Sequence, residues 1–403
     1  MGKRLEKLKR FRQKQRRNLL VGLLIIALFL SVVILIYSQI SSESPALGEH
    51  VKKMGKETAQ VEKNSISSTP TASTSASEVA TSIPKKLTVI AVGDILLDRQ
   101  VGGMIKKYGV DEPFSDVTNI LSDADVTVAN LECALSTRGA RADKEYTFRG
   151  NPEWAIGIKN AGIDAISLAN NHSLDFGAEA LEDTIGTLDK YGIYHAGAGM
   201  NSSEALLPAT METDGKKVSF LAFSYIIPNG FLPSPTRAGI AYARSPFALV
   251  TNGIKDAKEN SDFVILSFHW GMEYKDYPIK SQVELARLAI DAGADLVVAH
   301  HPHVIQGIEI YKSKLIAYSL GDFVFDHYSR KTGEAFILRC EIDEEKTLKA
   351  KATPVYLTSN GKPQVVVGNE ANIILKRLEK ISKDLGTNMK IENNEAIIEI
   401  ENN

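Results

Sequence analysis

The chain has little cysteine, glycine and proline, and these low counts exclude several classes of protein. Only two cysteines, Cys133 and Cys340, occur in 403 residues, too few for a disulfide scaffold or a cysteine-rich zinc module. A disulfide between them outside the cell is one alternative, and two buried free thiols are the expected one. Glycine (29) and proline (14) are too scarce for a collagen-like protein. Because 44% of the chain is hydrophobic, a sizeable core in one large or two small domains is expected.

The main part of the chain also lacks an excess of positive charge. Residues 1–18 hold nine Lys or Arg and one Glu, and since the whole chain carries a formal charge of −2, the other 385 residues carry −10. A nucleic-acid-binding domain shows the opposite bias, with a basic folded part. We therefore expect no nucleic-acid partner.

An uncharged apolar run, Leu19–Tyr37, follows the basic segment. A helix of this length can span a hydrocarbon core of about 30 Å at about 1.5 Å per residue. A cleaved signal peptide is the alternative, but its apolar region is normally about 7–15 residues, and Ser38-Gln39-Ile40 is a poor cleavage signal. The excess of cations before the run places the N-terminus in the cytoplasm. The sequence thus predicts a cytoplasmic tail over residues 1–18, a transmembrane helix over residues 19–38, and everything beyond outside the cell, on the cell membrane.

A Ser/Thr-rich segment without aromatic residues covers residues 39–84. Such a composition cannot bury enough surface to offset its ordering entropy, so a flexible linker is expected. The folded part is then residues 85–403.

Short β-branched runs alternate with amphipathic helical stretches in the folded part, a pattern typical of an α/β fold with covered sheets. Strands are expected at Leu87–Val92, Val126–Ala129, Ala165–Leu168, Val218–Phe223, Phe263–Phe268, Leu296–Ala299 and Leu315–Tyr318. Helices are expected at Pro152–Ala161, Ala178–Tyr191, Ala248–Asn260 and Ser281–Ala292. After residue 328 a β/α extension, packed on the same domain, is expected, with strands at Ala335–Glu341, Leu348–Tyr356, Gln364–Val367 and Ala396–Ile400 and a helix at Asn369–Leu385.

Polar side chains follow six of the expected strands at the point where each strand ends. They are Gly93-Asp94, Asn130-Leu131-Glu132, Asn170-Asn171-His172, His269-Trp270-Gly271, His300-His301-Pro302-His303 and Ser319-Leu320-Gly321-Asp322. In open α/β folds the carboxyl ends of the strands form the edge where ligands bind. One such ending is a weak signal, but six together predict a functional site.

These residue types are the ligands of divalent ions such as Zn²⁺, Mn²⁺ or Fe²⁺. In an extended chain, residues i and i+2 face the same way, so His301 and His303 are expected to project together, and Pro302 favours the extended form. A bridging carboxylate with several imidazoles suits two metals, which polarise a phosphoryl or carbonyl oxygen and acidify bound water. Beside them, His172 could protonate a leaving group.

The motifs GD, NLE, NNHSLDFG, HWGMEY, HHPHVIQGIE and YSLGDFVFD, in this order over residues 87–328, resemble the CapA family of poly-γ-glutamate capsule proteins, related to calcineurin-like metallophosphoesterases. The resemblance implies a two-sheet sandwich flanked by helices in four layers, with a dinuclear site at one edge. It implies Asp94 as a ligand of the first metal, Glu132 as the bridging carboxylate, Asn171 and His269 on the second metal, and His301 and His303 divided between them. His172 would be the acid.

The sequence departs from the superfamily at four positions. The usual Asp-x-His after the first strand is Asp94-Ile95-Leu96, without the His, which puts the first metal in question. Glu132 replaces a bridging Asp, His300 stands where Gly is common, and Asp322 stands where the family often has Asn.

Each candidate also has a purely structural explanation. Asp94 could close a turn, Glu132 could be a surface carboxylate, and Asn170 or Asn171 could be turn residues, of which we choose Asn171 as the ligand. His172 could be a core histidine paired with Asp175, which in turn could cap the helix after Gly177.

Four further residues are candidate substrate contacts. Trp270, Glu273 and Tyr274 follow His269 and could line a groove, although Trp270 could equally pack against the sheet. Arg149 could bind a carboxylate or phosphate, or be a solvated loop charge.

Three functions fit these observations. The first is a membrane-anchored protein of the synthesis or export of poly-γ-glutamate or another envelope polymer, with a two-metal hydrolase site, an anionic polymer as substrate and other membrane subunits as partners. The second is a non-catalytic scaffold of a polymer-export complex, favoured by the missing His after Asp94. The third is a phosphoesterase acting on envelope phosphate esters. Only the scaffold needs no metal.

Overall fold

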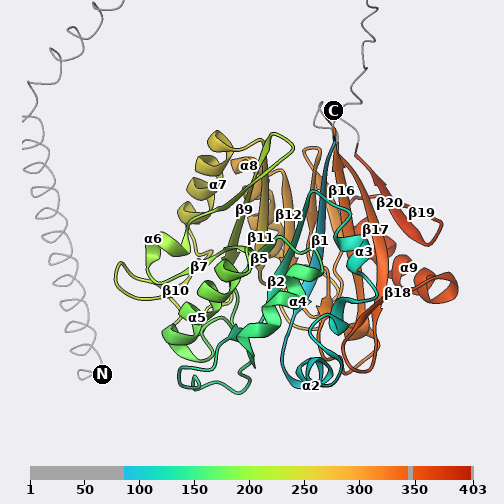
Figure 1. Ribbon diagram of the computed structural model, residues 1–403. Helices are drawn as coiled ribbons and strands as arrows, with labels where there is room; N and C mark the ends of the chain where they lie inside the picture. Colours follow the sequence, from blue (N-terminus) through green and yellow to red (C-terminus); the bar gives the residue numbers. More distant parts are fainter. Residues whose placement is uncertain (1–85, 344–347, 401–403) are drawn as a thin grey trace, which may run out of the picture. The chain divides into compact units, whose positions relative to one another are not determined.

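The computed structural model describes residues 86–343 and 348–400 (Figure 1). The expected cytoplasmic tail, transmembrane helix and linker, residues 1–84, lie outside the described residues. Within the described ranges, no helix is long and apolar enough to cross a membrane.

The first sheet of the described chain has ten strands and is mixed. Its order is β19-β20-β17-β16-β1-β2-β5-β6, with β15 beside β1 and β18 beside β17. The strands are β1 (Leu87–Ile95), β2 (Val126–Leu131), β5 (Ala165–Ser167), β6 (Tyr194–Ala196), β15 (Asp322–Val324), β16 (Glu334–Ile342), β17 (Leu348–Leu357), β18 (Pro363–Val365), β19 (Lys390–Glu392) and β20 (Glu395–Glu399). Strands β1, β2, β5 and β6 run parallel, whereas β16 pairs antiparallel with β1 and joins the C-terminal part to the same sheet.

The second sheet has six described strands in the order β13-β14-β12-β11-β9-β8. They are β8 (Ala209–Thr213), β9 (Lys216–Ser224), β11 (Phe263–His269), β12 (Leu296–His300), β13 (Ile308–Tyr311) and β14 (Lys314–Ala317). Strands β9, β11, β12 and β14 are parallel. Two small pairs complete the strands: β3 (Ala134–Leu135) with β4 (Arg149–Gly150), and β7 (Ala198–Gly199) with β10 (Gly239–Ile240).

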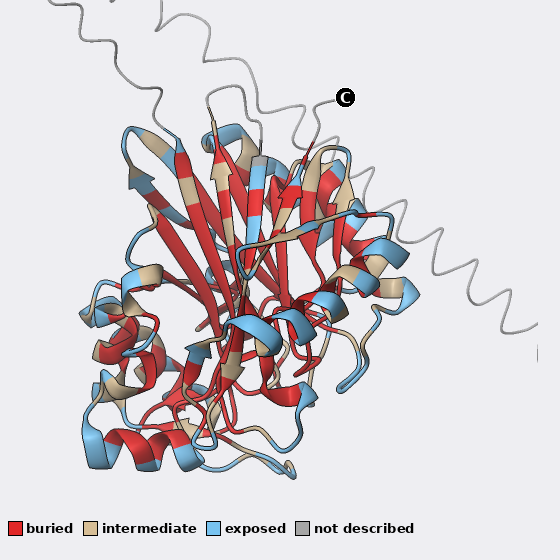
Figure 2. Cartoon of the chain, turned by 90° about the vertical axis from the view of Figure 1, so that its right-hand side faces the viewer, coloured by how far each residue is buried: buried red, intermediate tan, exposed pale blue. Residues whose placement is uncertain are grey.

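Helices cover these sheets. The longer ones are α2 (Arg99–Tyr108), α4 (Ala155–Asn160), α5 (Gly177–Lys190), α7 (Ala248–Asn260), α8 (Lys280–Ala292) and α9 (Gly368–Asp384). The short ones are α3 (Thr118–Leu121), α6 (Ser202–Ala205) and the 3₁₀ turns η1 (Glu112–Phe114), η2 (Pro152–Trp154) and η3 (Lys331–Gly333). Figure 2 shows strands that are largely buried and helices that are exposed on one side.

The two sheets share an apolar core, and alternate residues of each strand point to opposite faces. In β1, Val89 packs in the core that also contains Phe220 of β9, whereas its neighbour Ile90 packs with α2 and α5. In β9, Leu221 packs with α7 and α8 instead. Helix α9 contributes Ile374, Leu375 and Leu378 to the core shared by the sheets. The expected mixed α/β fold with several helix-covered sheets is confirmed.

The element boundaries agree closely with the hydrophobic pattern. Helix α7 has the expected bounds, and α8 begins one residue earlier than expected. The expected helix over Pro152–Ala161 is divided into η2 and α4, because the proline opens a 3₁₀ turn before the α-helix. Strand β1 continues past Val92 to Ile95.

The extension of β1 depends on Gly93. A Cβ atom there would lie 1.9 Å from the carbonyl oxygen of Gly321, so only glycine allows this approach. The amide of Asp94 donates to the same carbonyl at 3.2 Å, and Asp94 is in register with Asp322 of β15 on one side and Asn130 of β2 on the other. Asp94 and Asn130, near the carboxyl ends of β1 and β2, therefore lie in register with Asp322 at the start of β15.

Candidate metal centre

The carboxylate of Glu132, directly after β2, is the centre of the site. It is fully buried, and neither of its oxygens has a hydrogen-bond partner. Three imidazole nitrogens face its Oε1: Nε2 of His172 at 3.8 Å, Nε2 of His303 at 3.8 Å and Nε2 of His269 at 3.9 Å. Burial and the neighbouring Asp94 charge raise the Glu132 pKa well above its usual value. A carboxylate in this position needs a cation or a proton.

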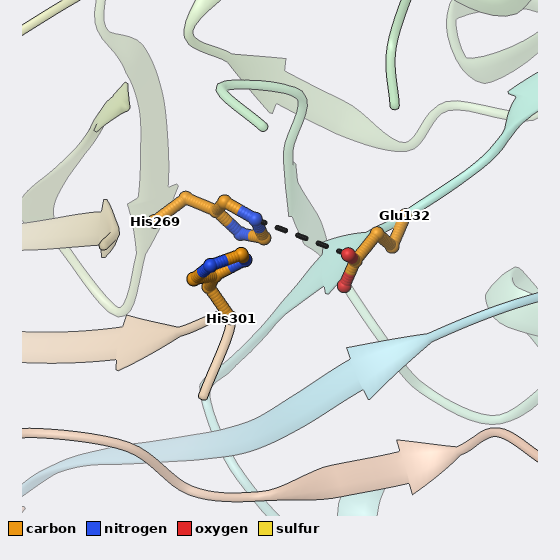
Figure 3. A group of neighbouring side chains, drawn as sticks. All are labelled: Glu132, His269 and His301. Carbon is orange, nitrogen blue, oxygen red and sulfur yellow. Dashed lines mark ion pairs between the residues drawn. The ribbon is translucent and has the colours of Figure 1, made fainter. Parts of the chain in front are cut away.

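His269, the last residue of β11, and His301, just after β12, lie on one side of Glu132. Figure 3 shows both rings directed toward its carboxylate, with ring centroids 4.8 Å apart. Nε2 of His269 lies 2.6 Å from Oδ1 of Asn171, so the two residues expected on one metal are together. Burial lowers the pKa of His269 well below its usual value and that of His301 to about 3. Both rings are therefore neutral, the form that coordinates a metal.

His303 belongs to the same centre but differs in charge. Its Nδ1 bonds Oδ1 of Asp322 at 2.8 Å, and its Nε2 faces Glu132. Burial alone would lower its pKa, but the carboxylates of Asp322 and Glu132 raise it well above the usual value. Burial in turn raises the pKa of Asp322 to about 6. A carboxylate behind the imidazole is the usual support for a metal-binding histidine.

Asp94 completes the cluster on the β1 side. Its Oδ1 accepts from Nδ2 of Asn130 at 2.8 Å and lies 3.2 Å from Nδ1 of His300, while its Oδ2 accepts from the amide of His301 at 3.1 Å. Burial would raise the Asp94 pKa, but His300, His303 and the backbone amide of His301 together outweigh burial and hold the pKa below the usual value. Asp94 therefore remains a carboxylate, ready to bind a cation.

Three groups of side chains bring possible ligand atoms within 4.8 Å of one another. They are Glu132 with His269 and His301, Glu273 with His301 and His303, and Asp94 with Glu132 and His303. Glu132 occurs in two of them. The grouping suits two ions that share Glu132, and the partnerless nitrogens of His269, His300 and His301, beside the two partnerless oxygens of Glu132, are what a missing cation would satisfy. The residues present fit a divalent metal.

His172 lies at the edge of this cluster with its own support. Its Nδ1 is 2.6 Å from Oδ2 of Asp175, and its ring packs on Phe148 at 4.3 Å between centroids. Lys144 lies 2.5 Å from Oδ1 of Asp175 and also donates to the carbonyl of Asn171. Asp175 makes no helix cap, because α5 has Phe176 at its N-cap and no side-chain cap bond. Burial lowers the pKa of His172 despite the Asp175 charge.

The local geometry of the histidine motif differs from the extended form expected. His301 has φ of 94° and His303 φ of 54°, so both lie in the left-handed region rather than on a strand. Both rings still reach the centre, 5.9 Å apart between centroids. We expected the two rings to project together because residues i and i+2 of an extended chain face the same way. That reason is wrong, because β12 ends at His300 and the chain then turns sharply.

Four expected substrate contacts have different surroundings. Trp270 is 1% exposed, stacks on Phe268 and donates to the carbonyl of Tyr318, so its ring packs against the sheet. Glu273 and Tyr274 are exposed beside the histidines, and the Tyr274 ring lies 6.3 Å from His303. Arg149 stacks on Phe176 with its Cζ 3.8 Å from the ring centroid, and no described contact joins it to the histidine cluster.

Several participants were not expected. For Asp322, the partner of His303, the one signal in the sequence was its position after an expected strand. Glu273 was expected beside substrate, not as a possible ligand. Lys144 comes from a loop with no pattern of its own, and only the structure brings it to Asp175. The two cysteines are buried free thiols, as expected.

A family model covers the part of the chain that contains this site. The model described as "Bacterial capsule synthesis protein PGA_cap" matches residues 88–327, which contain every residue of the cluster. The chain belongs to this family.

Two relatives are similar to this chain over most of their length. Capsule biosynthesis protein CapA of Bacillus anthracis is 31% identical over 303 residues, 73% of this chain and 74% of that protein. PGA biosynthesis protein CapA of Bacillus subtilis (strain 168) is 32% identical over 267 residues, 66% of this chain and 70% of that protein. A solved structure of the sulfate thiohydrolase SoxB of Termus thermophilus covers 74% of this chain and 61% of its own at 11% identity, with a TM-score of 0.37, too low to support an argument.

In this family member the missing His after Asp94 is explained by packing. Leu96, which stands in its place, and the preceding Ile95 are both fully buried in the apolar core. The imidazole nearest to Asp94 comes instead from His300 at the end of β12. His300 is therefore a further polar neighbour of Asp94, the expected ligand of the first metal.

Proposed function

We propose that this protein is anchored in the cell membrane and acts outside the cell in the synthesis or export of poly-γ-glutamate or a related envelope polymer. We further propose that it carries a dinuclear, hydrolase-type metal site. Membership of the capsule synthesis family supports the first part, and the printed names of its CapA relatives point to the same polymer. Other membrane subunits are proposed as partners.

One observation carries the metal site: the buried carboxylate of Glu132 has no hydrogen bond and is faced by three imidazole nitrogens within 4 Å. An unpaired buried carboxylate costs several kcal/mol in an apolar surrounding, unless it binds a cation or a proton. With Asp94 and Asp322, three buried carboxylates converge here. The residues proposed to hold two ions are Asp94, Glu132, Asn171, His269, His301 and His303, with Glu132 shared.

Two Mn²⁺, Fe²⁺ or Zn²⁺ ions, when bound, would polarise the scissile carbonyl or phosphoryl group and supply an acidified water. The protein residues do the rest. Asn171 is held by Lys144 through its backbone and meets His269 through its side chain, so its amide oxygen has a set direction. The ring packing of Phe148 limits water around His172.

His172 is proposed to move the proton of the leaving group from its Nε2. Asp175 accepts from Nδ1, which holds the ring in the tautomer and orientation that present Nε2 to the cluster. Lys144 in turn pairs with Asp175 and holds the carboxylate in place. This chain of three residues resembles the support of other acid–base histidines.

The arrangement of the layers supports the same proposal. Two helix-covered sheets share a core and deliver the site from the carboxyl ends of β1, β2, β11 and β12. We propose that this is the four-layer metallophosphoesterase-like sandwich expected from the sequence. A phosphoesterase acting on envelope phosphate esters remains the second candidate, because the same ligands serve either bond.

The experiment is a gene-replacement assay in the source cells. Deleting the gene should lower cell-surface γ-glutamyl polymer, and the parent gene should restore it. Glu132→Gln should fail to restore the polymer at equal protein abundance, whereas His195→Ala, which alters a histidine beside Asp189 outside the cluster, should restore it. Full restoration by Glu132→Gln would favour a non-catalytic scaffold. Polymer unaffected by deletion would end the polyglutamate assignment.

A further inference from the structure

Arg99, the first residue of α2, is exposed and held in a set orientation beside the candidate metal centre. Its Cζ lies 4.5 Å from the centroid of the Phe148 ring and 5.6 Å from that of Tyr146. Its Nη1 donates to the hydroxyl of Tyr328 at 2.9 Å. A guanidinium over an aromatic face is attracted by the ring, so these contacts fix the direction in which the remaining N–H donors point.

Arg99 has no carboxylate partner within the described chain at the 4.0 Å limit of an ion pair. Five other described arginines do pair with carboxylates: Arg138, Arg287, Arg330, Arg339 and Arg377. Asp326 is near enough to feel the charge of Arg99, although burial dominates and raises the Asp326 pKa. A guanidinium offers five donors, and Tyr328 takes one of those of Arg99. The others are available to an anion.

The position of Arg99 relative to the centre follows from two ring contacts. The Phe148 ring under Arg99 lies 4.3 Å from the His172 ring, so Cζ of Arg99 is no more than about 9 Å from His172. A γ-linked glutamate residue spans roughly 6 Å when extended, since it has two more backbone carbons than an α-linked residue. One to two residues of such a chain would therefore join Arg99 to the reacting bond.

The surroundings of Arg99 are accessible to a polymer. Tyr146 is 56% exposed and Tyr328 70%, and Tyr274 beside His303 is 57% exposed. Tyr146 and Tyr328 both contact Arg99. Exposed aromatic side chains beside a cation give a long anionic chain both apolar and charged contacts.

The backbone at Arg99 also has an uncommon conformation. Its φ is 50°, in the left-handed region that residues with a Cβ atom seldom adopt. The Asp98 carboxylate holds the turn, because Oδ1 accepts from the Arg99 amide at 2.7 Å and Oδ2 from the Arg149 amide at 2.9 Å. The turn directs Arg99 toward Phe148 instead of along the helix.

We propose that Arg99 binds a free carboxylate of the substrate chain, one or two residues from the bond that faces the metal centre. The inference rests on the proposed function, because it takes poly-γ-glutamate, which carries one free α-carboxylate on each residue, as the chain. The planar guanidinium matches a carboxylate with two parallel hydrogen bonds, and Tyr328 keeps the plane in place. Arg99 is thus a substrate-binding residue that selects for a charged polymer.

The test measures binding of a short fluorescent γ-linked glutamate oligomer to the full chain in detergent with added Mn²⁺, by fluorescence anisotropy. Arg99→Gln should weaken binding at least about tenfold, since it removes a charge-assisted bond. Arg99→Lys should lie between, because the charge remains but the planar fork is lost. Tyr328→Phe should weaken binding by a smaller factor. Arg339→Gln, which removes an arginine paired with Asp123, is the matched control and should bind like the parent.

A second oligomer tests the chemistry of recognition. A γ-linked glutamate oligomer of the same length, whose α-carboxyls are amidated and therefore uncharged, should bind the parent and Arg99→Gln equally weakly. Equal binding of the charged oligomer to parent and Arg99→Gln would overturn the inference, and so would a parent that binds inorganic polyphosphate but not the glutamate oligomer. Metal content of each variant is measured alongside. Arg99→Gln should keep the metal content of the parent. A parent without metal would refute the proposed metal site, and this outcome is independent of the result for Arg99.

Discussion

The carboxylate of Glu132 and the ring of His303 face each other, with Oε1 and Nε2 3.8 Å apart. Neither Glu132 oxygen has a hydrogen bond, whereas the opposite nitrogen of His303 bonds Asp322 at 2.8 Å. The pKa of each of the two residues is raised well above its usual value: burial and Asp94 act on Glu132, and the surrounding carboxylates overcome burial at His303. Both shifts favour the protonated forms of two groups that must lose their protons to bind a metal.

Metal affinity should increase with pH as a result. Both groups must lose their protons to coordinate, and their raised pKa values mean that the metal-free protein keeps those protons to higher pH than free Glu or His side chains. Each proton displaced contributes about tenfold in affinity per pH unit while it is still bound. Competition of the full chain with a chelator for Zn²⁺ at pH 6, 7 and 8 measures this. An affinity that stays constant over this range would show that neither group is a ligand.

His172→Ala should keep the metal, but its turnover rate should fall by about 10²–10⁴-fold, because the substitution removes the proposed acid and leaves the ligands. His172→Asn should behave alike, since an amide is no acid near neutral pH. Asp175→Asn should show a smaller loss, because Asp175 orients the ring through Nδ1. The measurement compares metal content with hydrolysis of γ-glutamyl and phosphate-ester substrates. His172 lies as near to Glu132 as His303 does, so loss of metal in His172→Ala would identify it as a ligand instead.

Trp270→Ala should destabilise the protein by about 3–5 kcal/mol, because it empties a buried site between Phe268 and Tyr318. Tyr274→Ala should change stability by no more than about 0.5 kcal/mol, since the ring is exposed. Denaturant unfolding of both variants provides the comparison. A Trp270→Ala variant that unfolds like the parent but binds the polymer poorly would show that Trp270 contacts substrate instead of stabilising the fold.

Protease added to intact cells with their wall removed should digest the folded part. The reason is the basic segment 1–18 followed by the uncharged run Leu19–Tyr37, which places residues 39–403 outside. Immunoblotting against the folded part follows the digestion, and a cytoplasmic protein serves as the control for lysis. A folded part that resists protease in intact cells, yet is cleaved after lysis, would contradict the topology.

Much of the site could be predicted because strand ends leave a pattern in the sequence. A buried strand such as β11 reads as a continuous apolar run, and His269 breaks that run where the strand meets the edge of the sheet. The same holds for Glu132 directly after β2, and Asp322 follows β14 after a short connection. Parallel strands bring such residues together whatever the separation in sequence, so the cluster could be expected before its geometry was known.

The rest of the site could not be predicted because loops have no comparable period. Lys144 is held by an ion pair with Asp175, and the turn at Arg99 is held by the Asp98 carboxylate. No repeating pattern in the sequence predicts either contact. Arg149 was expected either to bind a carboxylate or phosphate or to be a solvated loop charge, and its guanidinium stacks on Phe176. The left-handed backbone of His301 and His303 follows from the sharp turn after β12, which Pro302 alone does not specify.

The most direct measurement of the central claim is the metal content of the purified full chain by plasma mass spectrometry. The parent should contain one to two equivalents of a divalent transition metal, and a His301→Ala/His303→Ala double variant should lose most of it while keeping its circular dichroism spectrum. The control His195→Ala, altered outside the cluster, should match the parent. A double variant with the metal content of the parent, or a parent that binds no metal even when Mn²⁺, Fe²⁺ and Zn²⁺ are supplied, would contradict the account.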